Sequence, residues 1–136
     1  MSTLYTAIAT ANGREGRAAS SDQRLDVALS TPKEMGGSGE GTNPEQLFAA
    51  GYAACFASAL QLIGRKQKVD VSEASVTAEV GLVSEGKGFS LAVTLRVELP
   101  DELHGETGTA LVEAAHQVCP YSHATRGNIP VNLVVE

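Results

Sequence analysis

The chain has 136 residues, of which 43% are hydrophobic, and this is enough material for one domain with a buried core. Ten lysine and arginine residues stand against sixteen aspartate and glutamate residues, so the formal charge is −6, and no stretch collects enough positive charge to follow a phosphate backbone. We therefore expect a single domain over residues 1–136 that has no nucleic-acid partner.

The first ten residues, MSTLYTAIAT, lack the charged start, the long apolar stretch and the cleavage signature of a secretory signal. We therefore expect a cytoplasmic protein. Thiols in the cytoplasm are kept reduced, so a disulfide in this chain would more often be transient and catalytic than structural.

The first part of the chain predicts short strands separated by turns. Alternating residues favour a strand over residues 4–11, and the dipeptide NG favours a tight turn into a second strand within GREGRAASSD. The segment LDVALS, residues 25–30, predicts a third strand that stops at Pro32. The glycine-rich stretch EMGGSGEGTN then predicts a surface loop.

A helix is predicted directly after this loop. Thr42 or Asn43 can cap it, Pro44 suits its first position, and Glu45 places negative charge in its first turn. Gly64, followed by RKQK, predicts its end, so the predicted helix holds no lysine or arginine.

Residues 46–63 of this helix contain no charged residue, which raises the question of a membrane span. The run holds alanine, glycine, serine and glutamine as well as leucine and phenylalanine, so it is marginal for crossing a bilayer. We therefore expect no membrane partner. A helix that is apolar on all sides is otherwise a central helix, buried by its own domain or by a second subunit.

The second part of the chain predicts two long strands, a helix and a closing strand. Residues 75–83 and 89–99 alternate between apolar and polar side chains, with a hairpin loop at SEGKG. Residues 107–118 predict a helix, and VNLVVE predicts the last strand. The apolar face of the helix is predicted to hold Leu111, Ala114, Ala115 and Val118. We therefore expect an α+β fold.

The two cysteines lie in different settings, which suggests a working pair. Cys55 lies in the apolar helix, and Cys119 precedes Pro120 in HQVCPYSHATRGN. An ionised thiol can attack a peroxide, and a second thiol can then close a disulfide. The sequence therefore predicts a thiol peroxidase.

Cys55 needs a positive charge, because apolar burial raises the pKa of a thiol. Arg14, Arg17 and Arg126 are the candidates, from the same chain or from a second subunit. Glu45 could orient such a guanidinium through a bidentate pair, since it lies ten positions before Cys55 on the predicted helix.

Simpler interpretations remain open at this point. Cys55 could be structural, because free cysteines are often buried, and Glu45 could serve only the helix terminus. His116, Cys119 and His123 could be metal ligands, although this spacing lacks the paired CxxC elements of a strong zinc motif.

Four segments carry a resemblance to a known family. The segments are GREGRAASSD, LDVALSTPKEMGG, TNPEQLFAAGYAACF and AAHQVCPYSHATRGNI, and they occur in order over essentially the whole chain. In these motifs the chain resembles the organic hydroperoxide resistance proteins, the Ohr branch of the Ohr/OsmC superfamily. The resemblance implies an intertwined homodimer in which antiparallel sheets wrap two central helices, with the active site at the dimer interface.

The resemblance also implies roles for individual residues. Cys55 would be the peroxidatic nucleophile, Cys119 the resolving thiol, Arg14 the catalytic arginine and Glu45 its partner, with Arg17 as the second choice for the arginine. The implied reaction reduces an organic hydroperoxide to an alcohol through a sulfenic acid on Cys55 and an intramolecular disulfide to Cys119. A lipoylated protein or another dithiol would restore the thiols, and no metal or flavin cofactor is expected.

Apolar residues near the nucleophile would favour alkyl and fatty-acid hydroperoxides over hydrogen peroxide. We expect Leu47, Phe48, Tyr52 and Phe56 to supply this apolar surface. Three other functions stay open: a general OsmC-like peroxidase with another peroxide preference, a redox-sensing or small-molecule binding module that does not turn over, and a purely structural dimer.

Overall fold

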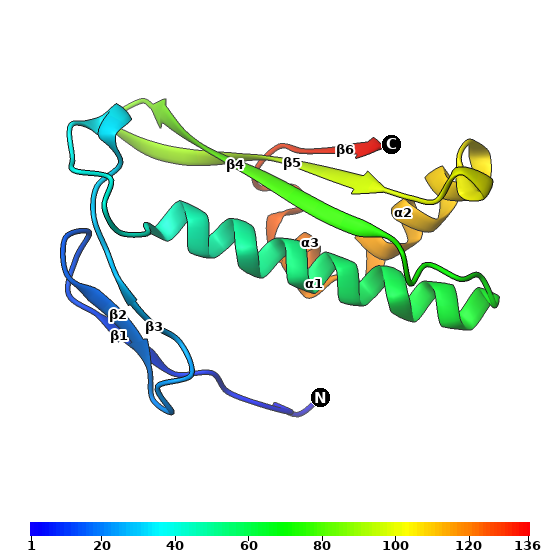
Figure 1. Cartoon of the computed structure of the whole chain (residues 1–136), viewed down its shortest axis with the longest axis horizontal. Helices are drawn as coiled ribbons and strands as arrows, with labels where there is room; N and C mark the ends of the chain where they lie inside the picture. Colours follow the sequence, from blue (N-terminus) through cyan, green and yellow to red (C-terminus); the bar gives the residue numbers. More distant parts are fainter. The chain divides into compact units, whose positions relative to one another are not determined.

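The computed structural model describes all residues from 1 to 136, and its contacts gather in two compact units, Met1–Leu47 and Phe48–Glu136. The first unit contains β1 (Ala9–Ala11), β2 (Arg17–Ser20), β3 (Asp26–Ala28), the short 3-10 helix η1 (Lys33–Met35) and the first turn of α1 (Pro44–Gln67). The second unit contains the rest of α1, β4 (Ser75–Glu85), β5 (Gly88–Glu98), η2 (Asp101–Leu103), α2 (Glu106–Val118), α3 (Pro120–Thr125) and β6 (Val131–Val135) (Figure 1). A single domain over residues 1–136 stays a prediction.

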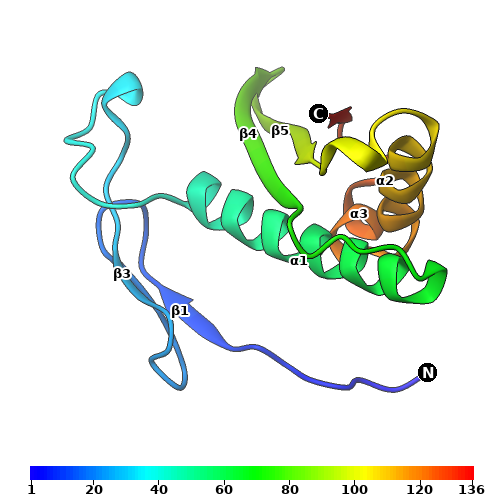
Figure 2. The same ribbon diagram turned by 45° about the vertical axis from the view of Figure 1, so that its right-hand side comes forward.

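The first unit is a small antiparallel sheet in the order β1-β2-β3 (Figure 2). The strand predicted over residues 4–11 is shorter than expected, because only its last three residues pair with β2. Strand β2 is four residues long, so it ends before it could pair with the rest of the predicted strand. Leu4, Tyr5 and Ile8 are consequently exposed in the single chain.

Helix α1 begins where the sequence predicts and ends later. The Asn43 side chain caps it, since its Oδ1 accepts a hydrogen bond of 2.8 Å from the Gln46 N–H. The predicted end at Gly64 is wrong, because the helix continues to Gln67 and closes with Lys68 in the left-handed conformation. A Cβ on Gly64 would come within 2.8 Å of a Val71 methyl group, so this glycine permits close packing and does not terminate the helix.

By length and composition α1 could cross a membrane, but a core helix of a soluble protein passes the same test. It contributes six buried residues, Tyr52, Phe56, Ala59, Leu60, Ile63 and Gly64. Only 33% of its most apolar stretch is buried within the chain. The expectation of a helix buried on all sides is therefore not met by the single chain, and much of its apolar surface is left uncovered.

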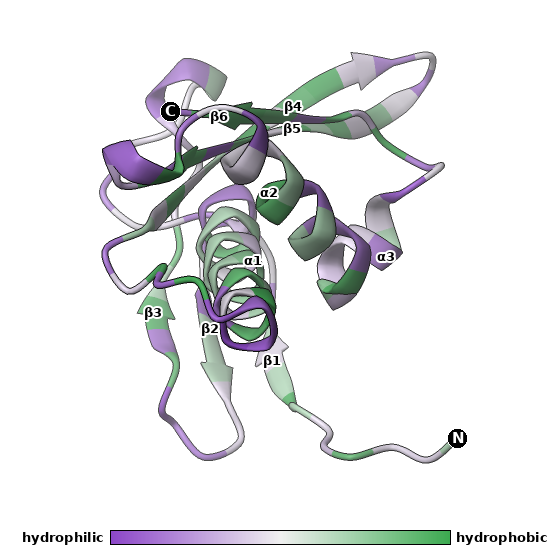
Figure 3. Cartoon of the chain, turned by 90° about the vertical axis from the view of Figure 1, so that its right-hand side faces the viewer, coloured by the Kyte–Doolittle hydropathy of each residue, from purple (hydrophilic) through white to green (hydrophobic).

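The second unit is built on a three-stranded sheet in the order β4-β5-β6. Strands β4 and β5 form the predicted hairpin, with Gly86 in the left-handed conformation at the turn, and β6 pairs in parallel with β5. Side chains of β4 alternate between exposed and half-buried, as expected for a sheet with one covered face. Figures 1 and 3 show α1 and α2 on the same face of this sheet, which confirms the α+β prediction.

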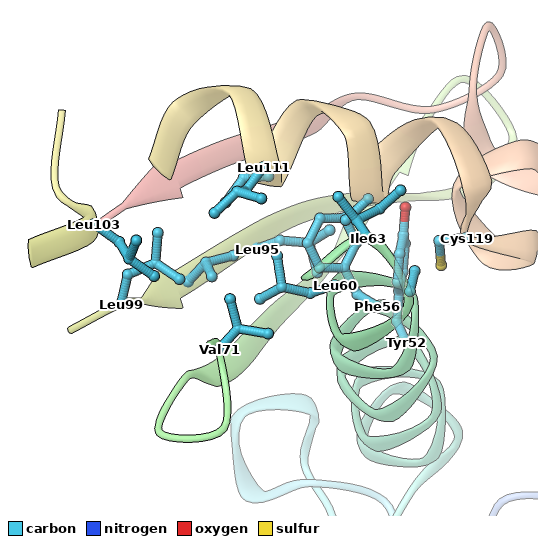
Figure 4. Close-up of a cluster of buried hydrophobic side chains, with 14 of the residues drawn as sticks. Tyr52, Phe56, Leu60, Ile63, Val71, Leu95, Leu99, Leu103, Leu111 and Cys119 are labelled. Carbon is cyan, nitrogen blue, oxygen red and sulfur yellow. The ribbon is translucent and has the colours of Figure 1, made fainter. Parts of the chain in front are cut away.

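The core of this unit lies between the sheet and the helices. Figure 4 shows Leu60 of α1 together with Leu95 of β5 and Leu111 of α2 in one cluster of buried side chains. The predicted face of α2 is only partly correct, because Val112 is buried and Val118 is exposed. Gly108 explains the difference, since a Cβ at this position would come within 2.3 Å of the Leu103 carbonyl oxygen. The glycine lets α2 approach the chain before it along this face.

Candidate functional site

The two cysteines of the chain meet in the second unit. Both are free thiols, and the Cys119 Sγ lies 3.2 Å from the Cys55 Sγ. A disulfide needs a separation of about 2.05 Å, so closing the bond requires the sulfurs to approach by roughly 1 Å. The fold therefore brings two cysteines that are 64 positions apart in sequence into direct contact.

Cys119 is held at the junction of two helices. It adopts an extended conformation, ends α2 by donating its N–H to the Ala115 carbonyl at 2.9 Å, and accepts the His123 N–H at 3.0 Å. Pro120 then occupies the first position of α3. Helix α3 was not predicted from the sequence, although a proline that follows an extended residue is a usual start of a helix.

The environment of Cys55 favours its neutral form. Burial raises the pKa of the Cys55 thiol, a hydrogen bond from the Tyr121 backbone opposes this, and the adjacent Cys119 sulfur raises the pKa further. Cys119 itself is fully buried, whereas Cys55 is partly exposed. A reagent from solution therefore reaches Cys55 first, and Cys55 needs a cation to become a nucleophile at neutral pH.

A buried network of hydroxyl groups connects α1 to α3. The Tyr52 hydroxyl lies 2.8 Å from Ser122 Oγ and 3.1 Å from Thr125 Oγ1. Ser122 Oγ lies 2.7 Å from His116 Nδ1, which extends the network to α2. All three helices around the thiols are thus joined by polar contacts. An apolar pattern around Tyr52 does not predict this network, because the pattern carries no information about where the hydroxyl points.

Arg14 and Glu45 form a bidentate ion pair in the first unit. Two hydrogen bonds of 2.9 Å join the guanidinium nitrogens to the two carboxylate oxygens. The Arg14 guanidinium lowers the pKa of the Glu45 carboxyl, and Glu45 raises the pKa of Arg14. The geometry is the one predicted for this pair, and Glu45 lies in the first turn of the helix that also carries Cys55.

The other two candidate arginines have different partners. Arg17 pairs with Asp26 across the sheet of the first unit, and both side chains are more exposed than Glu45. Arg126 donates a hydrogen bond of 2.6 Å to the His116 carbonyl near the end of α2. Of the three arginines, only Arg14 is paired with the predicted glutamate.

The metal hypothesis for His116, Cys119 and His123 finds no support in the geometry. No group of three or more histidine, cysteine, aspartate or glutamate side chains is placed to hold an ion. His116 Nδ1 is occupied by its contact with Ser122.

Cys55 lies on the wall of a cavity of about 400 Å³. The other lining residues are Ser58, Ala59, Leu62, Arg65, Val118 and Pro120. The expectation that Tyr52 and Phe56 would line this surface is wrong, because both are fully buried in the core. Phe48 lines a different cavity of about 500 Å³, which also contains Phe89 and Tyr121.

Comparisons with known proteins agree on one group of relatives. The family model described as OsmC-like protein matches residues 37–134. The organic hydroperoxide resistance protein of Xanthomonas axonopodis pv. citri (strain 306) is 55% identical over 135 residues, which cover 97% of this chain and 94% of that protein.

Solved structures extend the likeness to the fold. An organic hydroperoxide resistance protein from Elizabethkingia anophelis is 48% identical, covers 100% of this chain and 99% of its own, and superposes with a TM-score of 0.93. The organic hydroperoxide resistance protein OhrB of Bacillus subtilis is 42% identical, with 98% and 100% coverage and a TM-score of 0.88.

Proposed function

Since the chain belongs to the organic hydroperoxide resistance branch of the OsmC-like family, we propose that it is a two-cysteine peroxidase that reduces organic hydroperoxides to alcohols. The single observation that carries this proposal is the 3.2 Å separation of two free thiols, one of which lines a cavity. A purely structural pair of cysteines would not need an opening to solvent beside one sulfur.

The proposed reaction has three steps. The Cys55 thiolate attacks the outer oxygen of the hydroperoxide, the O–O bond breaks, and the alkoxide takes a proton to leave as an alcohol, while Cys55 is oxidised to a sulfenic acid. The Cys119 thiol then attacks the Cys55 sulfur, which forms the disulfide and releases water. A dithiol finally reduces the disulfide and is itself oxidised to a disulfide.

We assign the stabilisation of the Cys55 thiolate to Arg14. A cation beside a thiolate lowers the pKa of the thiol, which would offset the burial of Cys55. Glu45 would act as a positioning residue, because its bidentate contact holds the guanidinium in one orientation. Arg17 is the less suitable candidate, since it pairs with Asp26 of β3 and not with the predicted glutamate, and its ion pair is more exposed than that of Arg14.

The proposal includes a homodimer built from two copies of a single domain that spans residues 1–136. The uncovered apolar surface of α1 and the exposed Leu4, Tyr5 and Ile8 support it, because apolar surface of this extent is unusual on a protein that works as a monomer. A second copy would cover this surface.

The proposed reductant is a lipoylated protein or another dithiol. Attack from solution would occur at the Cys55 sulfur, because Cys119 is fully buried. Cys119 would then be the leaving thiolate. A reducing compartment such as the cytoplasm would keep the two thiols free between catalytic cycles, in line with their state in the structure.

The function is tested by mixing the reduced protein with tert-butyl and fatty-acid hydroperoxides in a stopped-flow instrument. Cys55→Ser should lose activity, and Cys119→Ser should accumulate a sulfenic acid that a dimedone reagent traps. Multiple turnovers with dihydrolipoamide are expected. Full activity in Cys55→Ser would refute the proposal, and a single oxidation without turnover would identify a redox-sensing module instead.

A further inference from the structure

His116 is tied to α3 at two points, one through its backbone and one through its ring. Its carbonyl group lies four positions before Pro120, which has no N–H to donate, so α2 cannot satisfy this carbonyl. Arg126, at the end of α3, donates the missing hydrogen bond at 2.6 Å. The ring nitrogen Nδ1 lies 2.7 Å from Ser122 Oγ in the first turn of α3. Both contacts span the bend at Cys119.

The hydroxyl groups beside His116 fix which of its ring nitrogens carries the proton. Each hydroxyl has one hydrogen, and Thr125 gives its hydrogen to the Ser122 carbonyl oxygen at 3.2 Å. Tyr52 then donates to Thr125 Oγ1, which leaves the Tyr52 oxygen to accept the hydrogen of Ser122. Ser122 Oγ in turn accepts from His116, so the ring donates through Nδ1–H. The opposite order would lose the contact between Thr125 and the Ser122 carbonyl.

The ring of His116 is neutral at pH 7. Burial and the charge of Arg126 lower the pKa of His116 below its ordinary value, and the charge of Glu113 opposes them only in part. A neutral imidazole has a single N–H group. In this ring that group is directed at Ser122.

A simpler role for His116 is to satisfy the buried Ser122 hydroxyl. That hydroxyl already has a partner in Tyr52, 2.8 Å away, so it does not need a histidine. His116 and Ser122 each lie three positions from Cys119, one before it and one after it, so their hydrogen bond closes a short loop with the thiol at its centre. This loop restricts the backbone that carries the Cys119 sulfur, which lies 3.2 Å from the sulfur of Cys55.

We propose that His116 is a positioning residue for the resolving step, because its Nδ1–H, donated to Ser122 across the bend, holds the Cys119 sulfur within bonding reach of Cys55. The inference rests on the proposed function and deepens it. In the resolving step the S–S bond forms, the S–O bond of the sulfenic acid breaks, and the Cys119 proton leaves with the hydroxide as water. All of these residues belong to the second unit, so the arrangement does not require a second copy of the chain.

The inference is tested by letting Cys119 compete with a trapping reagent. The reduced protein receives one equivalent of tert-butyl hydroperoxide in excess dimedone, and mass spectrometry gives the ratio of Cys55 adduct to disulfide. This ratio reports only the fate of the sulfenic acid, so it does not depend on how fast Cys55 reacts with the peroxide. His116→Ala should raise the ratio by about tenfold, which corresponds to the loss of about one buried hydrogen bond.

Two further variants separate positioning from a general loss of structure. The amide nitrogen of His116→Asn stands where Nδ1 stands, one bond beyond Cγ, whereas that of His116→Gln stands where Nε2 stands. His116→Asn should therefore restore most of the wild-type ratio, and His116→Gln should restore little of it. This comparison decides the question even if His116→Ala does not fold.

His123→Ala is the matched control, since it removes an imidazole from the exposed side of α3 and should leave the ratio unchanged. An unchanged ratio in His116→Ala, or equally raised ratios in His116→Asn and His116→Gln, would overturn the inference.

The protonated nitrogen is identified by ¹⁵N NMR of the His116 ring in the reduced protein at pH 7. The wild type should carry the proton on Nδ1, and Ser122→Ala should remove this preference because it takes away the acceptor. A proton on Nε2 alone in the wild type would overturn the inference.

A last measurement does not use peroxide. In mixtures of dihydrolipoamide and lipoamide, the equilibrium constant for closing the Cys55–Cys119 disulfide should fall by a similar factor in His116→Ala and recover in His116→Asn. If no protein consumes peroxide but this constant depends on His116, the positioning of Cys119 is supported and the peroxidase proposal fails. If peroxide is consumed but neither the ratio nor the constant depends on His116, the peroxidase proposal stands and the inference fails.

Discussion

At the scale of single residues, the acidity of Cys55 decides whether the thiol pair can do chemistry. Burial raises the pKa of this thiol above its ordinary value, so in these surroundings alone only a small fraction would be ionised at neutral pH. The Tyr121 backbone contact opposes burial but does not reverse it. A peroxidase built on Cys55 therefore depends on an additional cation, for which Arg14 is our candidate.

Arg14→Ala should slow the reaction of the reduced protein with organic hydroperoxide by about tenfold or more at pH 7, because an adjacent opposite charge typically shifts a pKa by about 1–3 units. The rate of the variant should rise with pH to a higher midpoint than that of the wild type, since the thiolate is the reactive form. Stopped-flow rates between pH 6 and pH 10 measure this. Arg17→Ala is the control, and an unchanged midpoint in Arg14→Ala would exclude the assignment.

Glu45 contributes to stability in a pH-dependent way. Arg14 lowers the pKa of its carboxyl group in the folded state, so the pair stabilises the fold above the ordinary carboxyl pKa and loses this effect as the pH falls through the lowered value. Glu45→Gln should therefore be less stable than the wild type at pH 7, and the difference should shrink below about pH 4.

Urea unfolding of both proteins at a series of pH values checks this expectation for Glu45. Glu40→Gln, in the exposed loop before α1, is a control with the same change of charge and no ion pair. A stability difference that is independent of pH would show that the Arg14 contact does not perturb Glu45 in solution.

At the scale of elements, the positions of three helices set the distance between the two sulfurs. Helix α3 is only six residues long and carries no buried apolar side chain of its own, since its buried residues are Ser122 and Thr125. Its contact with α1 combines the packing of the Tyr121 ring against Phe48 and Tyr52 with the Tyr52 hydroxyl, which lies within hydrogen-bond distance of both buried residues. Figures 1 and 2 show α3 lying beside α1.

Tyr52→Phe should destabilise the reduced protein by about 1–2 kcal/mol, because it removes two buried hydrogen bonds while hardly changing the packing. The variant should also form the Cys55–Cys119 disulfide more slowly, since α3 would be held less firmly. Urea unfolding and the rate of thiol loss after one equivalent of peroxide measure the two effects. Tyr121→Phe is the matched control, because no hydrogen bond of the Tyr121 hydroxyl is present. Equal effects in the two variants would refute the role of Tyr52.

The elements that the sequence predicted correctly are those with strong local signals. Alternating apolar and polar residues predicted β4 and β5, and Asn43 with Pro44 predicted the start of α1. The incorrect predictions are explained by tertiary packing. The end of α1 depends on Gly64 packing against Val71, and the buried face of α2 depends on Gly108 approaching Leu103, and neither contact is visible in a periodic pattern.

The same division holds for the site. The bidentate pair of Arg14 and Glu45 was predictable because both residues belong to recognisable motifs and their chemistry is complementary. The cavity beside Cys55 was not predictable, because it requires knowing that α1 continues beyond Gly64 and which side of it faces Val118. Long-range packing, which the local sequence does not encode, decides where α1 ends and which of its sides faces Val118.

At the scale of the whole molecule, the chain leaves apolar surface uncovered. Most of the apolar stretch of α1 is not buried, and the N-terminal segment exposes several large side chains. A chain of this length can bury a core, but this chain leaves much of its apolar surface exposed. The homodimer that we propose would cover this surface and would make the folded state dependent on protein concentration.

Oxidation should stabilise the whole second unit. Cys55 and Cys119 are 64 positions apart, so their disulfide would close a loop over most of that unit and restrict the unfolded chain. The expected gain in the free energy of unfolding is about 2–4 kcal/mol. Little of this gain should be lost to strain, because the sulfurs already lie 3.2 Å apart in the reduced state.

Urea unfolding after one equivalent of organic hydroperoxide, with and without dithiothreitol, measures the gain. Cys119→Ser cannot form the bond and should show none, whereas a lower stability of the oxidised wild type would mean that the helices around the thiols must separate for the disulfide to form.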